Sequence, residues 1–206
     1  MISNHIHDAL AQVRTLQEMI LEKRLFKGYS GRARIASGSL ALACAAILAS
    51  PWIPATPQAH LTGWGAVLVI ALLLNYGALA SVFVLNPAFR QNPLMMKPAI
   101  DAVPPLAVGG VLSLALILLG QYNLLFGTWM ALYGLAHTSC RHSLPQWNYS
   151  VALFYLLSGG LCLVTPGVSF LNPWPMGIVF FAGELVGGSV LAMNKDDAGP
   201  QKTDKE

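Results

Sequence analysis

Residues 170–193 read FLNPWPMGIVFFAGELVGGSVLAM, and this stretch decides the fold. After the turn-forming residues at its start, about 20 residues follow that are mostly apolar or small, apart from the carboxyl of Glu184. An α-helix that crosses the hydrocarbon core of a bilayer needs a run of this length. The stretch therefore predicts a membrane-spanning helix that carries one acidic side chain near its middle.

Similar apolar runs recur along the whole chain. Of its 206 residues, 55% are hydrophobic and only 10% are charged, whereas soluble domains carry about 25% charged residues. The composition excludes an ordinary soluble domain, a nucleic-acid-binding domain and a disulfide-rich scaffold. We predict an all-α fold, namely a polytopic membrane protein with a six-transmembrane-helix bundle. The predicted spans are residues 35–53, 63–85, 102–120, 123–140, 149–166 and 174–193.

The positions of the basic residues predict the topology. Lys and Arg accumulate in short cytoplasmic segments. With six spans and a cytoplasmic N-terminus, all 12 Lys and Arg residues fall on the cytoplasmic side, and the opposite loops at 51–62, 121–123 and 166–173 contain none. We therefore predict a multi-pass protein of the plasma (inner) membrane with both termini in the cytoplasm. The net charge of +3 then indicates contact with the lipid bilayer rather than with nucleic acid.

The chain divides into a cytoplasmic N-terminal arm (1–34), a transmembrane domain (35–193) and a polar cytoplasmic tail (194–206). Apolar residues in the arm recur in steps of four and three between Ile2 and Ile20, which predicts an amphipathic helix. Such a helix packs along the inner membrane face, or it forms a short coiled coil with a second copy, or it docks a protein partner.

Glu184 is the best pointer to a functional site, because an ionisable group at the centre of a span costs about 2.5–3.5 kcal/mol on insertion scales. Its predicted partners are His137 and Tyr133 on the fourth span and Asn75 on the second. One interpretation is a cytoplasm-facing polar cavity or a proton-handling site built from these four residues. The alternative is that Glu184 is a structural residue whose hydrogen bonds hold helices together.

Motifs for chemistry are scarce. The sequence contains no HExxH, GxSxG, P-loop or dinucleotide fingerprint, so we assign no catalytic residue. The three cysteines have no metal-ligand spacing, and we predict neither a disulfide nor a metal site. No cofactor is expected. Haem in particular lacks a second axial ligand to accompany His137.

Glycines are placed where helices are expected to pack closely. Small residues four apart allow two helix backbones to approach within a membrane. The predicted helix-packing glycines are Gly183 and Gly187 on the sixth span, Gly109 and Gly110 on the third, and Gly159 and Gly160 on the fifth. These glycine-rich faces are a second place at which a partner or another copy could bind.

Four segments together resemble a group of uncharacterised small six-helix bacterial inner-membrane proteins. They are ALAQVRTLQEM at 9–19, YSGRARIASG at 29–38, MALYGLAH at 130–137 and FLNPWPMGIVFFAGELVGG at 170–188. The matching residues are Val13, Arg14, Ser30, Gly31, Gly38, Tyr133 and Gly134. The resemblance implies an amphipathic N-terminal helix, a Ser-Gly step into the first span and six helices. Members of the group are sometimes encoded beside a winged-helix regulator, which implies a regulated role in the envelope but transfers no catalytic residue.

Three functions remain open on the sequence. We favour a non-enzymatic scaffold or a subunit of a membrane complex, with a protein partner or a homo-oligomer formed through the arm or the glycine-rich faces. The second is a small transporter or channel that uses the polar site around Glu184. The third is a membrane electron-transfer or enzyme subunit with a ligand beside His137.

Overall fold

The described part of the chain is helical, with no strand among its residues. The computed structural model describes residues 12–13, 30–85, 97–141, 144 and 146–196. Its elements are α2 (Gly31–Leu48), α3 (Pro57–Leu85), α5 (Lys97–Asp101), α6 (Val103–Leu118), the 3-10 turn η2 (Tyr122–Leu124), α7 (Leu125–Ser139), α8 (Trp147–Val164) and α9 (Trp174–Asp196). The predicted all-helical fold is confirmed for these residues.

Five helices are long and apolar enough to cross a membrane: α2, α3, α6 together with the end of α5, α8 and α9. The 15-residue α7 is shorter, although η2 and α7 together cover most of the predicted fourth span. The predicted amphipathic segment between Ile2 and Ile20 lies outside the described residues, apart from Gln12 and Val13, which are helical.

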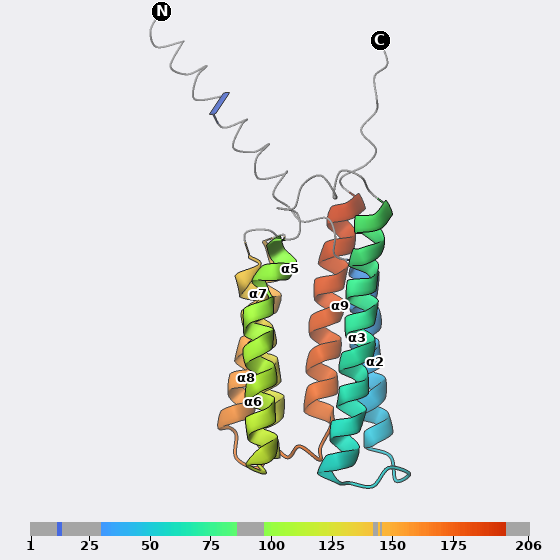
Figure 1. Ribbon diagram of the computed structural model, residues 1–206, viewed down its shortest axis with the longest axis vertical. Coiled ribbons are helices and arrows are strands. Elements are labelled where there is room, and N and C mark those ends of the chain that lie inside the picture. The colour runs from blue at the N-terminus through green and yellow to red at the C-terminus, as the bar shows by residue number, and fades with distance from the viewer. Residues whose placement is uncertain (1–11, 14–29, 86–96, 142–143, 145, 197–206) are drawn as a thin grey trace, which may run out of the picture.

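The long helices and α7 form a row in which each helix contacts the next, in the order α3, α2, α9, α8, α7, α6. Figure 1 shows α2, α3 and α9 in one group beside a second group formed by α5 to α8. The segment between α8 and α9 crosses from one group to the other at the lower end of the bundle in Figure 1. The contact of α9 with α8 therefore joins the two groups.

The first span is shifted relative to its prediction. It was expected at 35–53, but α2 runs from Gly31 to Leu48. It begins earlier because Ser30 caps it, accepting a hydrogen bond from the Ala33 amide at 3.3 Å. It ends earlier because Pro51 lacks an amide hydrogen and restricts the residue before it. Residues 31–34 thus belong to the helix and not to the arm.

The second span also starts before its predicted residue. Pro57 is the first residue of α3, where its missing amide hydrogen leaves no hydrogen bond unmade. The Thr56 hydroxyl accepts a hydrogen bond from the Ala59 amide at 3.3 Å and so caps the helix. As a result the helix takes in His60, which the sequence had suggested to be in a loop.

Glycines bring helices together at two pairs. A Cβ added at Gly31 would meet the Gly188 backbone, so α2 and α9 approach closely. A Cβ added at Gly159 would lie 2.6 Å from the Ala131 amide nitrogen of α7. The pairs α2–α9 and α7–α8 are therefore the closest-packed parts of the fold.

The outer helices of the row expose apolar side chains. Leu73 on α3 is 68% exposed, and Val111 on α6 is 69% exposed. Apolar surfaces of this extent are rare on soluble monomers, but they are the ordinary surface of a helix that faces lipid tails. Among the described residues, α6 buries none and α3 buries only His60, Trp64 and Leu79, so most of the interior is formed by α2, α7, α8 and α9.

Candidate functional site

A buried ion pair lies at the junction of the two helix groups. Arg34 on α2 donates from Nε to Glu184 Oε2 at 2.8 Å and from Nη2 to Glu184 Oε1 at 2.9 Å. The two residues are only 5% and 2% exposed. Two parallel hydrogen bonds of this kind are the strongest geometry that an arginine and a carboxylate can adopt.

Two tyrosines complete the environment of the carboxylate. The hydroxyls of Tyr133 on α7 and Tyr155 on α8 each donate to Glu184 Oε1 at 3.0 Å. Together with the guanidinium, they supply four donated hydrogen bonds to one carboxylate. Glu184 therefore has the partners that a buried negative charge needs.

The guanidinium has two further partners. Arg34 Nη1 donates to Asn148 Oδ1 at 3.0 Å, and Nη2 lies 2.8 Å from His137 Nε2. Because a guanidinium can only donate, His137 Nε2 must be the acceptor. We infer that the imidazole is neutral, with its proton on Nδ1. Four helices, α2, α7, α8 and α9, each contribute at least one side chain to this network.

The glycines beside Glu184 make room for the network. A Cβ at Gly183 would collide with the Tyr155 ring, and one at Gly187 would lie 2.5 Å from Arg34 Nη2. A Cβ at Gly38 would lie 2.7 Å from the Glu184 Cβ. Two of the predicted packing glycines thus accommodate side chains of the site.

The other predicted glycines differ in their surroundings. Gly159 lies against α7, as described above, whereas a Cβ at Gly109 would make only ordinary contact with Leu132, 3.4 Å away. A Cβ at Gly110 or Gly160 would meet nothing within 4 Å. Four of the six predicted glycines therefore face a neighbouring helix or side chain in the described part of the chain.

The structure brings three of the four predicted polar residues together. Glu184, His137 and Tyr133 belong to one network. Asn75 does not reach Glu184. Its amide donates to the Ser37 hydroxyl and to the Ala71 carbonyl, both at 2.9 Å, and so it links α3 to α2.

Sequence reasoning missed Arg34, Asn148 and Tyr155. Arg34 was counted with the cytoplasmic arm because it follows several other basic residues, and α2 begins early enough to bury it. Asn148 and Tyr155 carried a usable signal, since they are seven residues apart and so lie two turns apart on one face of α8.

Four buried side-chain nitrogens have no hydrogen-bond partner among the described residues. One is Asn148 Nδ2, at the edge of the ion-pair network. The others are both ring nitrogens of His60 and Nε1 of Trp64, one turn apart on α3. His60 packs against the Phe170 ring, with the ring centroids 5.9 Å apart. His60 and Trp64 therefore lie among aromatic side chains, and the described residues form no ion pair with them.

The cysteines and acidic groups add no second candidate site. Cys44, Cys140 and Cys162 are all described, and none is in a disulfide. Within the described ranges, no group of three or more His, Cys, Asp or Glu residues could hold a metal ion. The ion-pair network is thus the main candidate in the structure.

Comparison with protein-family models, curated proteins and solved structures gave no match to this chain. The resemblance to small six-helix inner-membrane proteins stays a prediction, and the function rests on the geometry of the site.

Proposed function

We propose that the chain is a non-enzymatic integral protein of the inner membrane, acting as a scaffold or as a subunit of a membrane complex. The observation that carries this proposal is that Glu184 accepts hydrogen bonds from four donors on three other helices. A carboxylate that is 2% exposed and bonded to side chains of three other helices is suited to fixing those helices in place.

The proposal includes six spans, with both termini in the cytoplasm. Five helices satisfy the length and apolar requirements for a span, and α7 preceded by η2 would supply the sixth. A sixth span also keeps every Lys and Arg on one side of the membrane, as the distribution of positive charge favours. Reporter fusions in the loops at 121–123 and 141–146 test this topology, because six spans place these loops on opposite sides.

A scaffold or subunit needs a partner, and co-purification tests for one. The full chain is extracted in mild detergent from its native membrane, and its mass and associated proteins are measured. The proposal expects a stoichiometric complex larger than one copy. A strictly monomeric species with no associated protein would contradict it.

A second candidate is a small transporter or channel. Ionisable groups within a membrane are functional pointers by default, and here Arg34, Glu184 and His137 connect helices of the two groups. Rocking of one group against the other would expose this junction to alternate sides. Solute or proton flux in proteoliposomes that disappears in the Glu184→Gln variant would favour this function over the scaffold.

A further inference from the structure

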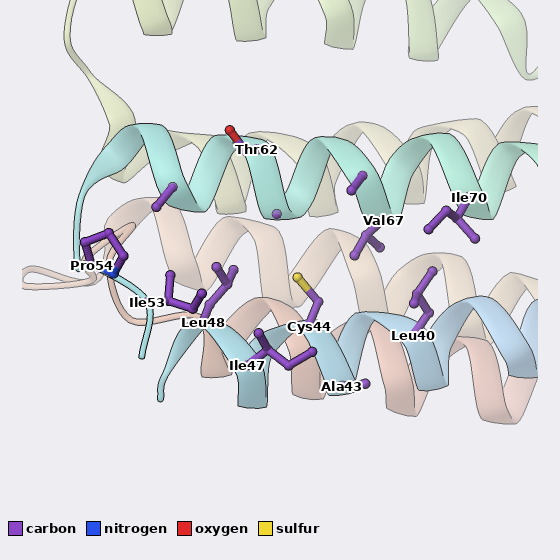
Figure 2. A pocket seen from close by; sticks show the side chains of 13 residues that line it. Leu40, Ala43, Cys44, Ile47, Leu48, Ile53, Pro54, Thr62, Val67 and Ile70 are labelled. Carbon is purple, nitrogen blue, oxygen red and sulfur yellow. The ribbon is translucent and has the colours of Figure 1, made fainter. Parts of the chain in front are cut away.

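An apolar groove runs between α2 and α3. Its volume is about 520 Å³, and α2, α3 and the loop that joins them form its walls. Figure 2 shows side chains of both helices along the groove, with Ile53 and Pro54 at the end nearest the loop. Nothing in the ion-pair network lines this groove, so it is a separate feature of the molecule.

The chemistry of the walls selects an apolar ligand. The only hydroxyl among the lining residues belongs to Thr62, and it already donates to the Gln58 carbonyl of its own helix at 2.9 Å. The Cys44 thiol is the other polar group in the wall. A polar ligand would therefore lose its hydrogen bonds to water without gaining replacements.

The length and position of the groove match one leaflet of a bilayer. Along α3 the groove runs from Ala59 to Ile70, which is about 16 Å at 1.5 Å per residue. Half of the hydrocarbon core of a bilayer is about 15 Å thick. The loop at the end of the groove carries Trp52, which is 89% exposed, and tryptophan is enriched at the level of the lipid headgroups.

A helix of a second copy would lie over the groove rather than inside it, because a helix is about 10 Å across with its side chains and the groove lies between two neighbouring helices. A single extended hydrocarbon chain is narrower and flexible. Small residues, Ala43, Gly63 and Ala66, line the groove, where larger side chains would fill the space.

We propose that this groove binds one acyl chain of a phospholipid from the leaflet opposite the cytoplasm. The inference rests on the proposed membrane location of the chain. The headgroup would lie at the level of Trp52, and the chain would follow the groove towards Leu40 and Ile70 near the middle of the bilayer. A lipid chain held there would fill the space between the side chains of α2 and α3.

Photocrosslinking tests the proposal with the full chain in phosphatidylcholine vesicles. A trace of phosphatidylcholine carries a diazirine on one acyl chain, and the crosslinked positions are mapped by mass spectrometry. Ile47 in the groove and Leu114 on α6 are each 59% exposed and serve as a matched pair. The proposal expects a several-fold higher yield at Ile47, because a seated chain remains there longer than lipid on an open face. Equal yields at the two positions would overturn it.

Two variants sharpen this test. Ala66→Phe fills the groove and should lower the yield at Ile47 to that at Leu114, whereas Ala80→Phe, at an exposed position of α3 outside the groove, should leave the difference intact. If Ala66→Phe does not fold, the comparison of the yields at Ile47 and Leu114 in the unmodified chain still tests the proposal. Crosslinks between two protein chains at Ile47 would overturn the proposal in favour of a second copy. No lipid crosslink on either face would instead overturn the membrane location itself.

Discussion

Replacing both partners of the Arg34–Glu184 pair should destabilise the protein no more than replacing either one alone. The variants are Arg34→Met, Glu184→Met and the double substitution. Each single change leaves an uncompensated charge in a site where the two residues are 5% and 2% exposed. Breaking a buried ion pair in this way costs about 3–5 kcal/mol, which is a factor of roughly 10² to 10³·⁵ in the unfolding equilibrium.

The double variant removes both charges and takes one hydrogen-bond partner away from several neutral groups. The hydroxyls of Tyr133 and Tyr155 lose their shared acceptor, although the Tyr155 hydroxyl still lies 3.4 Å from the Phe180 carbonyl oxygen. An unpartnered buried neutral group costs about 1–3 kcal/mol. We therefore expect the double variant to be about as stable as, or more stable than, either single variant.

Thermal unfolding in mild detergent measures this difference. The chain carries its own reporters, because Cys44, Cys140 and Cys162 are not in disulfides and a thiol-reactive fluorophore labels such groups as they become exposed. For a chain of this size, 3–5 kcal/mol corresponds to a fall in the midpoint of very roughly 6–20 °C. The control Leu114→Met, at an exposed position on α6, should leave the midpoint unchanged. If the loss of stability in the double variant equals the sum of the losses in the two single variants, the reasoning is refuted. The effects of substitutions add at independent sites but not at coupled sites.

Three further predictions concern single positions. Gly159→Ala should lower the midpoint because its Cβ would meet the α7 backbone, whereas Gly160→Ala should not, since its Cβ meets nothing within 4 Å. Tyr155→Phe should cost about 1.5–3 kcal/mol, the range for a hydrogen bond to a charged group, and no loss of stability in the same thermal assay would contradict a carboxylate at Glu184. Asn75→Leu should cost only about 0.6 kcal/mol, which is typical of a hydrogen bond between membrane helices, and a loss as large as that in Glu184→Met would place Asn75 in the main network.

Hydrophobic run length was enough to predict the helices, because a bilayer requires long apolar segments whatever their tertiary packing. Helix ends were less predictable. The caps at Ser30 and Thr56 moved the starts of α2 and α3 towards the N-terminus, since a single side-chain hydrogen bond can extend a helix into residues that are not strongly apolar. This shift of α2 turned Arg34 from an arm residue into a buried one.

Three of the six residues in the ion-pair network were predicted from the sequence. Glu184 stood out because a charge within an apolar run is costly, and His137 and Tyr133 followed from their spacing of four. Arg34 could not be recognised, because among basic neighbours an arginine looks like part of the cytoplasmic charge. Only the pairing of α2 with α9 shows that it reaches Glu184.

The ionisation state of Glu184 tests the central claim most directly. Infrared difference spectra between the unmodified chain and the Glu184→Gln variant, both in lipid vesicles at neutral pH, isolate the vibrations of this one carboxyl. A guanidinium with two parallel hydrogen bonds to both oxygens predicts that the difference contains carboxylate bands. A protonated carboxylic acid band in their place would contradict the ion pair and the helix arrangement built around it.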